Sequence, residues 1–333
     1  MSFAYITEEG AYVKKRGGNF VIGRNEEVVM EIPEEVLEGL VLIDGVQVSS
    51  RAMIEFLRLG VPVTWISSRG AFFGRLESTR HVQVFRQEKQ IQLEDSAFYL
   101  KMGKKCVAAK THNQLTLLRR ANRSANSEVV ENSIQEILKH WKHIFQAKDT
   151  SELMGYEGII ARLYFYALGS IVPENFRFEK RSRRPPKDAF NAMLSFGYTL
   201  LMYEVYTTLS NEGLHPYFGF LHSLKNHHPA LASDLMEEWR AVLIDSMVLS
   251  LVNHHEILPE HFEASKSEEK PGIFLTREGR GIFLHAYEKK MRTVNKYIQG
   301  KHSYRHSLGY QAAQYAQALM AENADLYEPI YLR

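Results

Sequence analysis

The spacing of apolar residues changes near residue 80, and this change restricts the possible fold more than any other feature of the chain. Before it, short runs rich in Val, Ile, Phe and Tyr are separated by turn-forming residues, a pattern typical of β-strands. After it, apolar residues recur at helical spacing through most of the remaining chain. We therefore predict an α+β protein, with a β-rich domain over residues 1–80 and an all-helical domain over residues 81–333.

Several elements can be placed within this outline. The runs AYVKKRGGNFVIGR and VPVTWISSRGAFFGRLE each predict a hairpin. Ser49 or Ser50 is suited to cap a short helix that ends at Leu59. In the second domain, one strongly apolar helix is expected to begin near a Ser151 cap. Further helices are expected near residues 188–210, 231–252, 279–299 and 303–322.

The composition argues against several classes of protein. A single cysteine, Cys106, excludes an internal disulfide and a thiolate metal site, and it fits a reducing cytoplasm. The first residues carry acids where a signal peptide needs a basic start, and no apolar run reaches about 18 residues. We expect a cytoplasmic protein without a membrane segment. The net charge is only +2, but basic residues are concentrated in Arg177–Lys187 and Arg277–Arg305.

Acidic residues stand in two helices that are otherwise apolar. Glu157 has no basic residue at helical pairing distance, which favours a helix margin, a distant partner or a metal ion. In the second helix, four acids fall within roughly 100° of the circumference. The plain alternatives are a solvated or distantly paired Glu157, and a solvated acidic face on which Arg240 pairs with Glu237. The four acids are Asp234, Glu237, Glu238 and Asp245.

Histidines gather between these two helices, in the segment LHPYFGFLHSLKNHHPA. Such clusters are more often surface or core residues than metal ligands, so both interpretations stay open. Carboxylates together with one imidazole suit Mg²⁺ or Mn²⁺, whereas Zn²⁺ more often recruits thiolates or several imidazoles. Phosphodiester chemistry uses such an ion to neutralise charge on phosphate oxygens and to align an attacking hydroxyl.

A basic segment, FRFEKRSRRPPK, precedes the helix expected near residue 188. Its cations are suited to phosphates, and Phe176 and Phe178 are suited to stack on unpaired bases. A charged loop that is merely solvated is an equal alternative. The six candidate DNA-binding residues are Arg177, Lys180, Arg181, Arg183, Arg184 and Lys187.

Four longer segments occur in a distinctive order and spacing. They are GYEGIIARLYF, RRPPKDAFNAMLSFGYTLL, GFLHSLKNHHPALASDLMEEWR and SYRHSLGYQA. Together they resemble the CRISPR-associated integrase family that captures new spacers, and the resemblance covers essentially the whole chain. It implies a β lobe followed by a helical catalytic lobe, in agreement with the change near residue 80.

The resemblance also implies which residues carry the chemistry. Glu157, His222 and Glu237 match the family's catalytic ligands for Mg²⁺ or Mn²⁺. The remaining polar positions that match the family are Asp234, which lies beside the site, and Asn191, Ser195 and Tyr198. Asn191 and Ser195 share one helix face, so for these two a local hydrogen bond is an equal alternative to a role near the ion.

The implied function is a metal-dependent DNA endonuclease and integrase that inserts captured DNA into the CRISPR array by transesterification. The resemblance further implies a homodimer, two copies of which flank a dimer of a small companion protein and hold a short DNA duplex. The β-rich domain is expected to dimerise, with Val61–Phe73 as an interface or a core strand. Two other functions stay open: a nuclease without integration, and a noncatalytic DNA-binding scaffold.

Overall fold

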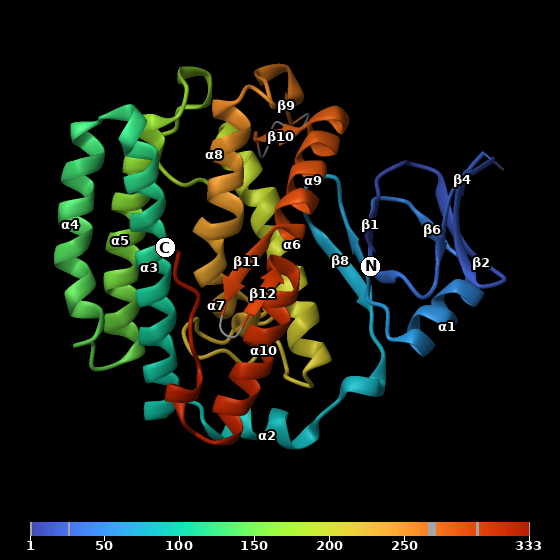
Figure 1. The fold of residues 1–333 in the computed structure, drawn as a ribbon, viewed down its shortest axis with the longest axis horizontal. Helices are drawn as coiled ribbons and strands as arrows, with labels where there is room; N and C mark the ends of the chain where they lie inside the picture. Colours follow the sequence, from blue (N-terminus) through green and yellow to red (C-terminus); the bar gives the residue numbers. More distant parts are fainter. Residues whose placement is uncertain (1, 26, 266–270, 298–299, 333) are drawn as a thin grey trace. The chain divides into compact units, whose positions relative to one another are not determined.

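A computed structural model describes residues 2–25, 27–265, 271–297 and 300–332 (Figure 1). The chain divides into two compact units, Met1–Val82 and Gln83–Arg333. Strands build most of the first unit, and helices build most of the second. The predicted α+β class is therefore confirmed.

Two four-stranded sheets form the first unit. Their strands are β1 (Ser2–Ile6), β2 (Ala11–Arg16), β3 (Asn19–Arg24), β4 (Glu27–Pro33), β5 (Leu37–Ile43), β6 (Gln47–Val48), β7 (Val63–Ile66) and β8 (Phe72–Leu76). One sheet has the order β1-β5-β7-β8 and is parallel except for β8. The other has the order β4-β3-β2-β6, in which only β6 pairs in parallel. The pairs β2–β3 and β7–β8 confirm the two predicted hairpins.

The first unit also contains the helix α1 (Ser50–Leu59), between β6 and β7, and a 3-10 turn at Thr79–His81, after β8. Phe56 of α1 is fully buried and stacks on Phe20 of β3, with ring centroids 4.1 Å apart. Ser49 caps the helix because its hydroxyl accepts a hydrogen bond from the N–H of Ala52. The cap is therefore Ser49, one of the two residues that the sequence had left open, and the helix ends at Leu59 as expected.

Helices dominate the second unit. They are α2 (Val84–Gln92), α3 (Ala97–Ala125), α4 (Glu128–Ile144), α5 (Thr150–Ile171), α6 (Ala189–Asn211), α7 (Ala230–Trp239), α8 (Ser246–Asn253), α9 (Arg277–Arg292) and α10 (Tyr304–Met320), with 3-10 turns at Glu174–Phe176, Pro259–His261 and Ala324–Leu326. α3, α4 and α5 pack together, while α7 packs against both α3 and α6. Among the helices in the described ranges, none is long and apolar enough to cross a membrane.

The stretch expected as one helix near residues 231–252 contains three segments. α7 is buried at every position, and a π-helical segment, Arg240–Asp245, joins it to α8. A π-helix bonds each residue to the fifth residue along, so it rotates the side chains that follow relative to an α-helix. Such segments are frequent at functional sites, and this one begins three residues after the predicted ligand Glu237.

The second unit is mostly helical but contains two short ribbons that the sequence did not indicate. β9 (Phe262–Ala264) pairs with β10 (Ile273–Leu275), and β11 (Val294–Tyr297) pairs with β12 (Gly300–Ser303). The helix expected to residue 299 therefore ends at Arg292. The β-branched Thr293 adopts an extended backbone, and Val294 starts the strand. Residues 298–299 lie outside the described residues.

Candidate metal centre

Helix α5 carries Glu157 and begins earlier than the sequence indicated. Its N-cap is Asp149, whose carboxylate accepts a hydrogen bond from the N–H of Glu152 at 2.8 Å. The Glu152 carboxylate accepts one from the N–H of Lys148, also at 2.8 Å. Together these bonds fix the N-terminus of α5 and the residue before its cap. The prediction of Ser151 as the cap was wrong because Ser151 lies inside the first turn.

The four acids of α7 and the π-helical segment are buried, so the interpretation as a solvated face was wrong. Each carboxylate has its own set of partners. Asp245 accepts hydrogen bonds from two tyrosine hydroxyls, and Glu238 accepts them from Tyr327 and from the N–H of Ile330. Burial is the main cause that raises the pKa of both acids, in the case of Glu238 to about 7. The four acids are Asp234, Glu237, Glu238 and Asp245, each at most 2% exposed.

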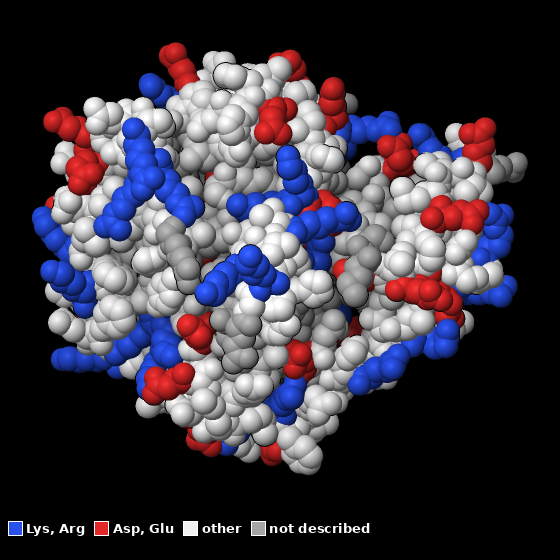
Figure 2. All heavy atoms as spheres, in the orientation of Figure 1, with Lys and Arg blue, Asp and Glu red and all other residues white. Residues whose placement is uncertain are grey.

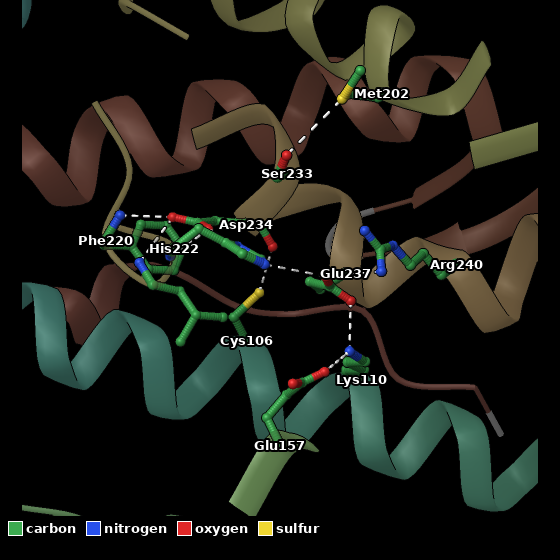
Figure 3. Close-up of polar contacts among 11 residues, drawn as sticks. Cys106, Lys110, Glu157, Met202, Phe220, His222, Ser233, Asp234, Glu237 and Arg240 are labelled. Carbon is green, nitrogen blue, oxygen red and sulfur yellow. Dashed lines mark hydrogen bonds and ion pairs between the residues drawn. The ribbon is translucent and has the colours of Figure 1, made fainter. Parts of the chain in front are cut away.

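Lys110 of α3 joins Glu157 to Glu237, as Figure 3 shows. Its ammonium donates a hydrogen bond to Glu157 Oε1 and lies 2.7 Å from Glu237 Oε2. The side chains of Lys110 and Glu237 are 5% and 2% exposed, so water screens this pair little. Burial opposes the charge on Lys110, but the two carboxylates outweigh it and raise the pKa of the lysine.

Arg240 holds the other oxygen of Glu237. Its guanidinium nitrogen lies 3.0 Å from Glu237 Oε1, three residues away along the chain. The predicted pairing of these residues is therefore present, although it lies in the interior rather than on a solvated face. Burial disfavours the carboxylate, but Arg240, Lys110 and His222 together lower the pKa of Glu237 to about 2. Glu237 is therefore ionised at neutral pH.

Asp234 fixes the loop that carries His222. Its carboxylate accepts hydrogen bonds from the backbone N–H groups of Phe220, Leu221 and His222 at 2.7, 2.9 and 3.0 Å. It also lies 2.6 Å from Nδ1 of the His222 ring. A carboxylate accepts, so the proton is on Nδ1 and a neutral ring keeps its lone pair on Nε2. That Nε2 atom lies 4.0 Å from Glu237 Oε1.

These donors fit a hard divalent ion. Two carboxylates and one imidazole nitrogen, with a carboxylate behind the imidazole, are a donor set for Mg²⁺ or Mn²⁺. Glu237 Oε2 is buried and pairs with the Lys110 ammonium at 2.7 Å, so an ion would reach this oxygen only beside or in place of that ammonium. Within the same residues, no three His, Cys, Asp or Glu side chains lie together as a formed ion site. The ammonium of Lys110 occupies the position between Glu157 and Glu237.

Comparison with known proteins decides the family. The protein-family model described as "CRISPR associated protein Cas1" matches residues 4–289 of this chain. The chain belongs to the Cas1 family. A curated relative, "CRISPR-associated endonuclease Cas1 3" of Thermus thermophilus, is 33% identical over 334 residues and covers 99% of this chain and 97% of that protein.

Two solved structures have the same Cas1 fold. A Cas1 protein from Thermotoga maritima aligns with a TM-score of 0.82 and 23% identity over 96% of this chain and 97% of that chain. A chain in a Cas6-RT-Cas1–Cas2 complex aligns with a TM-score of 0.84 and 25% identity. That alignment covers all of this chain but 36% of the other, which is much longer.

The other polar positions expected near the site belong to an adjoining network in this Cas1-family chain. Arg181 donates to Asn191 Oδ1 at 2.9 Å and to Ser195 Oγ at 3.0 Å. Tyr198 donates to Asp245, and the guanidinium groups of Arg181 and Arg240 lie over its ring, 5.3 and 4.8 Å from the centroid. Through Arg240, this network reaches Glu237.

The basic segment divides into an exposed part and an inward part. Arg181 bonds to the protein interior, so it does not present its charge to solvent as expected. Phe176 and Phe178 are 4% and 8% exposed and pack on other phenylalanines, so their predicted role in base stacking was wrong. The remaining cations are exposed: Arg177, Lys180, Arg183, Arg184 and Lys187.

The second basic region, Arg277–Arg305, covers α9, β11 and β12. Figure 2 shows Lys and Arg side chains gathered over these elements. Part of the charge is paired, because Arg292 and Arg305 both bind Glu288, and Arg305 also binds Glu204. This region therefore offers less free positive charge than its composition suggests.

Proposed function

We propose that this Cas1-family protein is a divalent-metal-dependent DNA endonuclease and integrase that inserts captured DNA fragments as spacers into a CRISPR array. The observation that carries the proposal is that Glu157 and Glu237 share the ammonium of Lys110, while Nε2 of His222 lies 4.0 Å from Glu237 Oε1. These groups come from three separate places in the sequence. The curated relatives are named CRISPR-associated endonucleases.

Glu157, Glu237 and His222 would hold Mg²⁺ or Mn²⁺. The bound ion supplies neutralisation of the charge that develops on phosphate oxygens and assists deprotonation of the nucleophile. Asp234 orients the His222 ring through Nδ1, and Arg240 fixes the Glu237 carboxylate through Oε1. Both residues therefore position ligands rather than bind substrate.

The proposed reaction is a transesterification. The 3′-hydroxyl of captured DNA attacks a phosphorus of the array strand, a new P–O bond forms, and the bond to the 3′-oxygen of the array strand breaks. The leaving 3′-oxygen takes a proton, so the number of phosphodiester bonds is conserved. With water as the nucleophile, the same site hydrolyses DNA and acts as a nuclease.

A divalent-metal titration followed by a strand-transfer assay tests the proposal. We expect Mn²⁺-dependent joined products from the wild-type protein and none from Glu157→Gln, His222→Ala or Glu237→Gln. Cutting without joined products would leave a simple nuclease. Variants that still cut and join DNA would contradict the site. A wild-type protein that shows neither reaction would indicate a scaffold.

The proposed assembly contains a homodimer, a small companion protein and DNA. The similar chain in a structure named as a Cas1–Cas2 complex supports the companion protein. The β-rich unit is proposed to dimerise because Val28, Val29 and Met30 of β4 are 47%, 70% and 52% exposed, although they are apolar. The segment Val61–Phe73 is the weaker interface, because β7 within it belongs mainly to the core. Light scattering with and without the companion tests the dimer.

A further inference from the structure

Cations of the protein already compensate the two carboxylate ligands of the candidate metal centre. Two carboxylates, Glu157 and Glu237, face two cations, Lys110 and Arg240. All of them are largely buried, with side-chain exposures of 17%, 2%, 5% and 17%. A buried carboxylate pair without a counter-charge would be costly, because the two like charges repel and neither is well hydrated. Lys110 removes this cost, since its one ammonium contacts both carboxylates.

The same contacts set Lys110 against a divalent ion. An ion that bridges both carboxylates would lie beside the ammonium, which now contacts Glu157 Oε1 and Glu237 Oε2. A divalent ion and an ammonium a few ångströms apart in a buried site repel strongly. Arg240 differs from Lys110 in that its ion pair is with Glu237 through the other oxygen, Oε1, and does not link the two carboxylates.

We propose that Lys110 is a resident counter-cation that takes the metal's position between Glu157 and Glu237 and must leave it when the ion binds. This inference rests on the proposed metal-dependent function. A lysine suits the role because its ammonium is a compact point charge on a flexible four-carbon stem, whereas an arginine fork is held more rigidly. Lys110 thereby lowers the affinity of the site for the ion and keeps the metal-free protein folded.

The test compares Lys110→Met with Lys101→Met in the full-length protein. Methionine keeps the unbranched shape of the lysine stem but has no charge. Lys101 lies on the same helix, but it forms a surface pair with Asp325 in which both side chains are at least half exposed. The measurements are calorimetric titration with MnCl₂ and thermal melting in EDTA or in MnCl₂.

We expect Lys110→Met to melt at a lower temperature than wild type in EDTA and to gain more from Mn²⁺. Its dissociation constant for Mn²⁺ should be tighter by about tenfold or more, because the ion no longer has to displace a buried ion pair. Lys101→Met should match the wild type in both measurements. Mn²⁺ affinity that is unchanged or weaker in Lys110→Met would overturn the inference.

Further variants separate this inference from the proposed function. Mn²⁺ binding that persists in His222→Ala and Glu157→Gln would contradict the proposed site itself. If the wild type binds no Mn²⁺ but Lys110→Met binds it, and His222→Ala abolishes that binding, the role of Lys110 is supported. If neither protein binds Mn²⁺, the role of Lys110 and the metal-dependent function both fail. Folding of Lys110→Met and Lys110→Gln in Mn²⁺ but not in EDTA supports the inference. Failure of both variants to fold even in Mn²⁺ overturns it, because Lys110 would then be needed beside the ion.

Discussion

Asp234 and Glu237 lie one helical turn apart, yet their contacts assign them different tasks. In Asp234→Asn, an amide N–H replaces the carboxylate oxygen beside His222 Nδ1. The asparagine then donates a hydrogen bond to Nδ1, whereas the aspartate accepted one from it. The ring then keeps its lone pair on Nδ1 and carries the proton on Nε2, which cannot bind a metal ion. We expect this change to weaken Mn²⁺ binding by about 10- to 100-fold, and Glu237→Gln to abolish it. Calorimetric titration of both folded variants measures the difference, and the reverse order would transfer the ligand role to Asp234.

Single residues of the site differ in how far the sequence could identify them. Glu157, His222 and Glu237 were singled out through a resemblance, since residue type and spacing alone left a solvated or distantly paired acid as the alternative. Lys110 was missed because it lies 47 residues from Glu157 and far from Glu237 along the chain. Its role follows only from the packing of α3 against α5 and α7. A lysine at a well-buried position of an amphipathic helix was the one signal available.

At the scale of elements, the cap of α5 gives a direct test of the helix that carries Glu157. Asp149→Ala removes the acceptor for the N–H of Glu152, so we expect the free energy of unfolding to fall by about 1 kcal/mol. Ser151→Ala, at the position that the sequence indicated, should change it by no more than a few tenths of a kcal/mol. Urea denaturation of the two variants compares them. Equal losses would show that the cap is not the determinant of this end of the helix.

The elements that sequence patterns predicted best are those with a simple period. Both hairpins of the first unit and the helices α6 and α10 lie close to their expected ranges. The π-helical segment was not predictable, because its residues, RAVLID, continue the apolar pattern of α7 and carry no glycine or proline. Its effect appears only after folding, when Asp245 accepts hydrogen bonds from two tyrosines.

At the scale of the whole molecule, Glu238 joins α7 to the C-terminal segment through Tyr327 and Ile330. Burial raises its pKa from 4.5 to about 7, although the hydrogen bonds oppose this shift. The stabilising contribution of the neutral acid is therefore complete below about pH 4.5 and is lost as the pH rises through 7. This loss is on the order of 3 kcal/mol.

The corresponding prediction is that Glu238→Gln flattens the decline in stability between pH 5 and pH 8. His222, whose pKa is raised, contributes a loss in the same direction above pH 6.5, so the difference between variant and wild type is the relevant quantity. Denaturation in EDTA across this range measures it and keeps metal binding out of the result. Parallel curves for the two proteins would show that Glu238 is already ionised at pH 5.

At the scale of the whole molecule, the exposed part of the basic segment predicts how the proposed DNA binding depends on salt. Arg183 and Arg184 are exposed, and neither their density nor their spacing suggests base reading, so we expect contacts with phosphates. Arg183→Ala with Arg184→Ala should weaken binding to unrelated duplexes alike and reduce the salt slope by about one counterion per lost contact. The control is Lys139→Ala with Lys142→Ala on α4, which removes the same charge from two other exposed positions. Fluorescence anisotropy over about 50–200 mM salt supplies the slopes. An unchanged salt slope would show that the two arginines do not contact phosphates. An equal change in the control would show that the effect depends on the net charge of the protein and not on these positions.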